Sequence, residues 1–350
     1  MKKSKVITVG NVKIGGGNPT TIQSMTNTKT KDHQGTIKQI KALEDVGCEL
    51  VRVAVSDYED ALALKKIKAN ITIPLIVDIQ FDHKLALMAA ENGADCIRIN
   101  PGNIGSELKV KEVVEACKFY DIPIRIGVNS GSISKRIIDK YAGVNKNSLV
   151  ASALEEIETL EKNNFFNTKV SIKASDPRMN IDSNILFREK CDYPLHLGVT
   201  EAGGLLRGSI KSAIGIGTLL YMGIGDTIRV SLSDNPLEEI KVAKQILQSL
   251  NLRTFGVEIV SCPTCARTDI DLIKMVAELE NRIDEIKGNY KIAVMGCVVN
   301  GPGEAREADY GITGKNKEGI IFKKGKIIDR VPEKDLINRL IEIINLEDWL

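Results

Sequence analysis

The sequence has 350 residues, of which 43% are hydrophobic and 27% charged, typical of a globular protein large enough to bury a core. Its formal net charge of +2 gives no general attraction to nucleic acid or membranes, so any anion binding must come from local clustering. Seven cysteines, no signal peptide and no apolar run of about 18 residues predict a cytoplasmic protein that binds neither nucleic acid nor membrane.

Eight short strand-like runs recur along the chain, and amphipathic patterns fill the spaces between them. The runs lie at residues 21–25, 50–55, 75–79, 96–100, 124–128, 169–174, 194–199 and 227–232. Helical patterns lie, for example, at residues 36–46, 107–119, 147–163 and 237–250. Eight strands alternating with helices over about 250 residues predict a (β/α)8 barrel, or TIM barrel. A doubly wound sheet is the competing fold, but it usually has fewer strands.

The pattern changes after residue 251, where a smaller α+β domain is expected. Strand-like runs at 256–260 and 291–295 enclose a predicted helix at 269–286. Residues 318–322 and 326–330 predict a hairpin that turns at Lys324 and Gly325, and a final helix is expected at 333–344. We therefore expect a barrel domain over residues 1–250 and a second domain over residues 251–350.

Polar side chains occupy every second position of the predicted barrel strands, between aliphatic ones. Because alternate residues of a strand share a face, the aliphatic set would face the helices and the polar set the barrel interior. The predicted inward set is Arg52, Arg98, Asn100, Arg125, Asn129, Ser171, Lys173, His196, Arg229 and Ser231.

Cations outnumber acids in this inward set. The visible inward acids are Asp78 and Glu201, and buried cations without counter-charges are costly. A structural ion pair could explain any single arginine, but Arg or Lys on five strands predicts binding of a multiply charged anion. Arginine forks suit phosphate oxygens, and barrel active sites lie at the carboxyl ends of the strands. A phosphate or diphosphate substrate is therefore predicted.

Three cysteines of the second domain have the spacing of metal ligands. Cys262 and Cys265 form a Cys-x-x-Cys pair, and Cys297 follows about thirty residues later. The residues alone fit zinc, an iron–sulfur cluster or a redox dithiol. The three histidines lie in the barrel, so none of them is an obvious fourth ligand. From the residues alone, Glu304 fits equally well as that fourth ligand or as an ordinary surface acid. The other cysteines, Cys48, Cys96, Cys117 and Cys191, are expected to be small core residues.

Long motifs in both domains resemble one enzyme family. They are Ser-Cys-Pro-Thr-Cys-Ala-Arg (261–267), Met-Gly-Cys-Val-Val-Asn-Gly-Pro-Gly-Glu-Ala (295–305), Gly-Gly-Gly-Asn-Pro-Thr-Thr-Ile-Gln-Ser-Met-Thr-Asn (15–27), Ile-Arg-Ile-Asn-Pro-Gly-Asn-Ile-Gly (97–105) and Leu-His-Leu-Gly-Val-Thr-Glu-Ala-Gly (195–203). The chain is similar over essentially its whole length to the 4-hydroxy-3-methylbut-2-enyl diphosphate synthases of the methylerythritol phosphate route to isoprenoids, in their shorter bacterial form.

The resemblance implies a TIM barrel followed by a domain like those of ferredoxin-dependent sulfite and nitrite reductases, with one [4Fe–4S] cluster. It implies Cys262, Cys265, Cys297 and Glu304 as cluster ligands, with Glu304 on an exchangeable iron. It also implies a help to proton transfer from Glu201. The diphosphate-binding positions that it implies are Arg52, Arg98, Asn100, Arg125, Asn129, Lys173, Arg229 and Ser231.

The implied reaction is the two-electron reductive ring opening and dehydroxylation of 2-C-methyl-D-erythritol 2,4-cyclodiphosphate. No Gly-x-Gly-x-x-Gly motif opens a βαβ unit, so electrons would come from flavodoxin or ferredoxin, as the resemblance implies. The resemblance further implies a homodimer in which the cluster domain of one chain caps the barrel of the other.

Two other functions compete with this interpretation. One is a redox-neutral barrel enzyme for a phosphorylated or pterin-like substrate with a structural zinc domain. The other is a nucleic-acid-binding zinc module attached to a barrel, which the near-neutral charge opposes.

Overall fold

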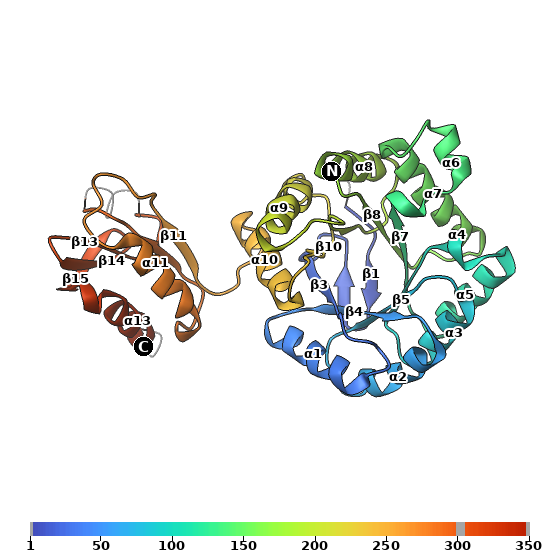
Figure 1. The fold of residues 1–350 in the computed structure, drawn as a ribbon, viewed down its shortest axis with the longest axis horizontal. Coiled ribbons are helices and arrows are strands. Elements are labelled where there is room, and N and C mark those ends of the chain that lie inside the picture. Colours follow the sequence, from blue (N-terminus) through green and yellow to red (C-terminus); the bar gives the residue numbers. More distant parts are fainter. Residues whose placement is uncertain (1–2, 299–304, 348–350) are drawn as a thin grey trace. The chain divides into compact units, whose positions relative to one another are not determined.

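The computed structural model describes residues 3–298 and 305–347 and divides into two units, Met1–Arg253 and Thr254–Leu350. The first unit is a ring of eight strands surrounded by helices (Figure 1). Its strands are β3 (Thr21–Met25), β4 (Leu50–Val55), β5 (Leu75–Ile79), β6 (Cys96–Ile99), β7 (Ile124–Asn129), β8 (Thr168–Lys173), β9 (His196–Leu197) and β10 (Thr227–Ile228). Its helices are α1 (His33–Asp45), α2 (Tyr58–Lys68), α3 (His83–Glu91), α4 (Pro101–Ile104), α5 (Glu107–Phe119), α6 (Lys135–Lys140), α7 (Lys146–Lys162), α8 (Pro177–Lys190), α9 (Leu205–Tyr221) and α10 (Pro236–Ser249).

The strands pair in the order β8-β7-β6-β5-β4-β3-β10-β9, and every neighbouring pair is parallel. A bridge between Val170 and Leu195 brings the two ends of this order together, so the barrel is nearly closed. The predicted TIM barrel is thus confirmed. The last two strands are shorter than predicted, in part because the chain leaves the ladder after Arg229: the backbone N–H of Leu232 donates to Glu239 of α10 at 3.1 Å.

An N-terminal hairpin, which the sequence analysis did not predict, closes the barrel at the amino ends of its strands. Strands β1 (Ile7–Val9) and β2 (Val12–Ile14) pair antiparallel, and Gly10 at the turn has φ +57°. The buried side chains of Ile7, Val9 and Ile14 pack against the first inward residues of β4, β5 and β6. The hairpin therefore acts as an apolar plug.

In the described residues of the second unit, a five-stranded sheet has two α-helices packed on one face. Parallel strands β11 (Glu258–Ser261), β12 (Lys291–Val294) and β13 (Tyr310–Lys315) continue into antiparallel β14 (Glu318–Lys323) and β15 (Lys326–Pro332). Helices α11 (Leu272–Asn281) and α13 (Leu336–Glu347) bury their apolar sides in the same core cluster. The sequence analysis missed β13, whose glycines hide the strand pattern. Gly311 lacks a side chain where the Phe322 ring of β14 packs.

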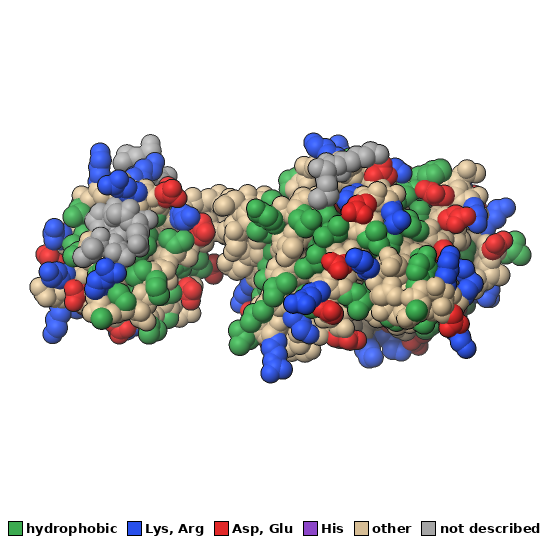
Figure 2. All heavy atoms as spheres, turned by 90° about the horizontal axis from the view of Figure 1, so that it is seen from above, with side chains coloured by type: hydrophobic (Ala, Val, Ile, Leu, Met, Phe, Trp, Pro, Cys, Tyr) green, Lys and Arg blue, Asp and Glu red, His purple; other side chains and the backbone are tan. Residues whose placement is uncertain are grey.

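Charged side chains of both signs are interspersed on the face of the first unit that Figure 2 shows, as the small net charge suggests. Among the described residues, no helix is both long and apolar enough to cross a membrane.

The plug should contribute measurably to stability. Replacing Ile14 (1% exposed) by alanine leaves a cavity against the barrel floor and should lower the free energy of unfolding by about 2–4 kcal/mol. Urea unfolding followed by circular dichroism measures this change. Val6→Ala, at a side chain that is 54% exposed, is the control and should change stability by less than about 0.5 kcal/mol. Equal, small effects of both variants would contradict the packing role.

Candidate functional site

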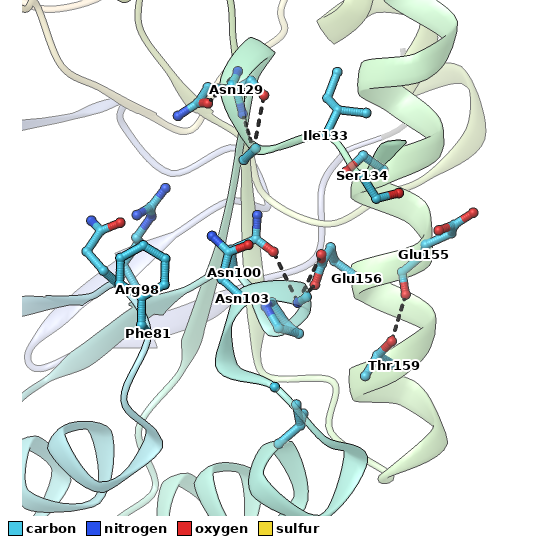
Figure 3. A pocket seen from close by; sticks show the side chains of 18 of the residues that line it. Phe81, Arg98, Asn100, Asn103, Asn129, Ile133, Ser134, Glu155, Glu156 and Thr159 are labelled. Atoms are coloured by element: carbon cyan, nitrogen blue, oxygen red, sulfur yellow. Dashed lines mark hydrogen bonds between the residues drawn. The ribbon is translucent and has the colours of Figure 1, made fainter. Parts of the chain in front are cut away.

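A polar cavity of about 960 Å³ opens at the carboxyl ends of β4 to β7 (Figure 3). Five of the residues singled out in the sequence line it: Arg52, Asp78, Arg98, Asn100 and Asn129. Helix α7 contributes Glu155 and Glu156, which lie on the side of Asn100 away from Arg98. The location agrees with the end of the barrel where active sites of this fold lie.

Asp78 joins two arginines at the cavity floor. Its carboxylate accepts a hydrogen bond from Arg98 Nη1 at 2.9 Å and lies 3.5 Å from Arg52 Nη2. Burial would raise the pKa of Asp78, but Arg52 and Arg98 outweigh burial and hold this pKa below its ordinary value. Burial lowers the pKa of Arg52 to about 10, against the effect of Asp78, so Arg52 remains charged at neutral pH. The carboxylate thereby fixes two guanidiniums side by side.

Arg98 lies across a glycine on the neighbouring strand. Gly127 occupies the inward position of β7 between Arg125 and Asn129, and its carbonyl accepts from Arg98 Nη2 at 3.1 Å. A Cβ at this position would stand 2.7 Å from Arg98 Nη2, too close for any real contact. Gly198 leaves room in the same way for Lys173, whose Nζ would be 2.6 Å from an added Cβ. These glycines determine where the two cations can lie.

Asn100 and Asn129 each end a strand and begin a short helical turn. Asn100 Oδ1 accepts from the backbone N–H of Gly102 at 3.1 Å, and Asn129 Oδ1 accepts from Gly131 at 3.0 Å. The buried Nδ2 of Asn100 has no hydrogen-bond partner among the described residues.

Arg125, Lys173 and His196 lie inside the barrel, where all three are buried. Burial, reinforced by Arg125, lowers the pKa of His196 far enough to keep its imidazole neutral. His196 Nε2 lies 3.3 Å from Lys173 Nζ, and Nδ1 lies 2.8 Å from Thr227 Oγ1. His196 therefore touches Lys173 directly, as a neighbour that can accept its hydrogen bond.

Lys169 is a buried cation that the sequence analysis left out. It lies one inward position below Ser171 on β8, and its Nζ has no partner among the described residues. Burial lowers its pKa to about 8. The alternation that identified Lys173 includes residue 169 as well, so the same signal could have found it.

Arg229 and Ser231 follow the last barrel strand, and Arg229 is paired with an acid that the sequence analysis missed. Both oxygens of Glu239, on α10, accept from Arg229 at 3.2 Å. The sequence gives little signal for this pair, because glutamates are common in first helical turns for a different reason, the helix dipole.

Two further acids, Glu201 and Glu156, have different environments. Glu201 is exposed on the loop after β9, with φ +54°, and is not among the residues that line the cavity. Glu156 is a cavity residue that the sequence analysis did not single out. Its oxygens accept from the N–H of Gly102 at 2.9 and 3.1 Å, while burial raises its pKa to about 7.

The three predicted thiols lie at or just beyond the carboxyl ends of the neighbouring strands β11 and β12. Cys262 Sγ accepts from the N–H of Gly296 at 3.2 Å, which ties the Cys262 loop to the residue preceding Cys297. Hydrogen bonds from Arg267 hold the pKa of the exposed Cys265 thiol below its ordinary value, which favours the thiolate. Glu304 lies outside the described residues, within which no three ligand side chains form a metal-binding group.

Comparison with known proteins identifies the family. The GcpE TIM-barrel domain matches residues 4–244, and the GcpE protein C-terminal domain matches residues 258–346. The chain belongs to the GcpE family. Two relatives in this family are named 4-hydroxy-3-methylbut-2-en-1-yl diphosphate synthase (flavodoxin). The one from Caldanaerobacter subterraneus is 56% identical, with 98% of this chain and 97% of the relative covered. The one from Clostridium perfringens is 57% identical, with 98% of each chain covered.

Solved structures resemble the barrel of this GcpE family member. Dihydropteroate synthase from Yersinia pestis covers 70% of this chain and 98% of its own, with a TM-score of 0.51 and 12% identity. The enzyme from Stenotrophomonas maltophilia covers 71% and 98%, with a TM-score of 0.51 and 12% identity. At this identity the likeness concerns the fold alone. The expected likeness of the second unit to sulfite and nitrite reductase domains stays a prediction.

Removing the charge of Asp78 should destabilise the barrel. Asp78→Asn leaves Arg52 and Arg98 without their counter-charge and should lower the free energy of unfolding at pH 7 by about 3 kcal/mol. Because the folded-state pKa of Asp78 is depressed, the wild-type advantage should be present at neutral pH and fade as the pH falls below about 4. Urea unfolding at several pH values measures both effects.

Asp57→Asn is the matched control for that prediction. Asp57 caps α2 and pairs with Lys31 at the exposed surface, and asparagine keeps the cap. Its stability should stay at the wild-type level. A pH-independent loss in Asp78→Asn would argue against the charge as the cause.

Adding one methyl group to Gly127 should impair anion binding more than folding. Gly127→Ala forces the flexible end of Arg98 away from β7 and should weaken the binding of inorganic pyrophosphate about tenfold. Isothermal titration gives the affinity, and urea unfolding should show a loss of only about 1 kcal/mol. Gly217→Ala, inside α9, is the control, since its Cβ would meet no atom closer than 3.9 Å. Unchanged affinity in Gly127→Ala would show that Arg98 does not hold the anion.

Proposed function

We propose that the chain is a flavodoxin-dependent 4-hydroxy-3-methylbut-2-en-1-yl diphosphate synthase, a cytoplasmic oxidoreductase of isoprenoid precursor biosynthesis. It would open the ring of 2-C-methyl-D-erythritol 2,4-cyclodiphosphate and remove one oxygen with two electrons and protons. The observation that carries this proposal is 56% identity to an enzyme of that name over 98% of the chain. The redox-neutral alternative with structural zinc has no comparable support.

The barrel cations would hold the diphosphate. The proposed contacts are Arg52, Arg98, Asn100, Arg125, Asn129, Lys173, His196, Arg229 and Ser231. Arg52 and Arg98 are held side by side by Asp78 before any ligand arrives, so little reorganisation accompanies binding. Lys173 and Arg125 are buried deeper in the barrel, and their burial lowers the pKa of both. An incoming anion would supply the negative charge that these cations lack.

Cys262, Cys265, Cys297 and Glu304 are the residues that we propose as ligands of a [4Fe–4S] cluster. The donor set fits: two of the thiols lie beside neighbouring strand ends joined by the Gly296 hydrogen bond, and Cys265 is predisposed to be a thiolate. When bound, such a cluster supplies one-electron transfers and Lewis-acid assistance to the departing oxygen.

Glu201 is our proposed participant in proton transfer. It lies on the loop that follows β9, and therefore at the carboxyl end of that strand, the end of the barrel at which the cavity opens. Its exposure lets the carboxyl exchange protons with solvent, while its left-handed backbone conformation restricts the orientation of the loop. The group would deliver the proton with which the substrate oxygen leaves as water.

The electron donor and the assembly are also proposals. The relatives' name specifies flavodoxin, and ferredoxin is the alternative donor. We propose a homodimer in which the cluster domain of one copy caps the barrel of the other. Arg253 is anchored beside the amino ends of β3 and β4, by Thr20 O at 3.0 Å and Glu49 at 2.7 Å, so the chain leaves the barrel opposite the cavity.

Anaerobic purification followed by metal analysis and assay tests the proposed function. The wild-type protein should contain about four irons and four sulfides per chain and convert the cyclic diphosphate when reduced flavodoxin is supplied. Glu304→Ala should lose cluster or turnover while its barrel still binds pyrophosphate. Glu307→Ala, a nearby exposed acid, is the control and should behave as wild type. A colourless protein with one zinc per chain would refute the proposal.

A further inference from the structure

A fully engaged carboxylate lies at the start of α10, next to the proposed anion site. Glu239 is 3% exposed, and four hydrogen bonds end on its two oxygens. Oε1 accepts from Arg229 Nη2 at 3.2 Å and from the N–H of Leu232 at 3.1 Å. Oε2 accepts from Arg229 Nε at 3.2 Å and from Ser24 Oγ at 2.8 Å. Since every strong acceptor direction is occupied, Glu239 is saturated and has no direct part in binding a ligand.

The two-point contact determines which side of the Arg229 guanidinium faces the barrel. Nε and Nη2 are taken by Glu239, and Nη1 lies 3.5 Å from Met25 Sδ, a weak acceptor. Met25 Sδ also lies 3.0 Å from Arg52 Nε, so one thioether separates the two arginines. The Nη1 edge of Arg229 is thus directed toward Met25, on whose other side Arg52 lies.

Electrostatic repulsion makes this contact necessary. Arg52, Lys173 and Arg229 repel one another, and this repulsion contributes to the lowered pKa of both Arg52 and Lys173. An arginine with a long flexible side chain would relieve the repulsion by turning toward solvent. The buried carboxylate of Glu239 opposes this movement of Arg229, because the movement would leave the charge of Glu239 buried and unpaired.

We propose that Glu239 is a positioning residue that locks Arg229 in the orientation needed to bind the substrate diphosphate. The inference rests on the proposed function, since it concerns the same anion. The alternative is a purely structural role, in which Glu239 fastens α10 to β3 and the β10–α10 connection through Ser24 and Leu232. The two roles differ in one respect: only the positioning role acts through Arg229.

A double-mutant cycle distinguishes the two roles. Glu239→Gln keeps the shape of the side chain but loses its charge, and in the holoenzyme it should raise KM for the cyclic diphosphate about tenfold with kcat nearly unchanged. The affinity for inorganic pyrophosphate should fall in parallel. In an Arg229→Ala background the same substitution should change neither quantity. Glu238→Gln, in the same helical turn and paired with Lys241 at the surface, is the control and should match wild type.

Several outcomes would overturn the inference. An unchanged KM in Glu239→Gln, or an equal rise with and without Arg229, would leave Glu239 with a structural role alone. If Glu239→Gln does not fold, Glu239→Asp decides the matter: its charge is retained but withdrawn by one methylene, so KM should still rise. A wild-type holoenzyme without turnover would refute the proposed function, while pyrophosphate titration of the same variants would still decide whether Glu239 acts through Arg229.

Discussion

Charge compensation at the carboxyl ends of the barrel strands governs the arrangement of the candidate site. Arg52 and Arg98 share Asp78, and Arg229 is held by Glu239, while Arg125, Lys169 and Lys173 are buried deeper in the barrel. The compensation is incomplete, since burial, reinforced by neighbouring cations, lowers the pKa of both Arg125 and Lys173. A barrel built in this way would fold with the proposed anion site already formed, and a multiply charged ligand would complete the balance.

The positions of the cations also depend on two glycines that leave room for them. Gly127 lies at an inward position of β7 and Gly198 directly follows β9, and a side chain at either place would collide with Arg98 or Lys173. Neither residue has a positive φ, so their role is to leave room rather than to permit an unusual backbone. Arg98 can therefore reach the Gly127 carbonyl on the neighbouring strand, and Lys173 can lie against Gly198.

The barrel could be predicted from the sequence because its strands are regular. Residues 21–25, 50–55 and 75–79 were predicted with the bounds that the structure gives, since short runs rich in aliphatic and β-branched residues are typical of buried strands. Strand β13 was missed because Gly311 and Gly314 replace residues that would mark a strand, and the hairpin β1–β2 because three-residue strands give too short a pattern.

Strand periodicity predicted which side chains share the inward face, but not their contacts. Alternation puts Arg52, Arg98 and Asp78 on that face, where the structure brings them together, but it carries no information about groups that come from helices. Glu239 and Glu156 approach from α10 and α7, so their roles depend on tertiary packing alone. Glu304 lies outside the described residues, and its role continues to rest on the family resemblance.

The apolar hairpin at the amino ends of the strands has a consequence for access to the barrel interior. With Ile7, Val9 and Ile14 packed against β4, β5 and β6, the described part of the barrel is filled by apolar side chains at this end, and its polar cavity opens at the other. In the proposed reaction, substrate, product and released water would therefore all pass through the opening at the carboxyl ends of the strands. A second copy that covers this opening during reduction would have to move away in every cycle, so opening would become part of turnover itself.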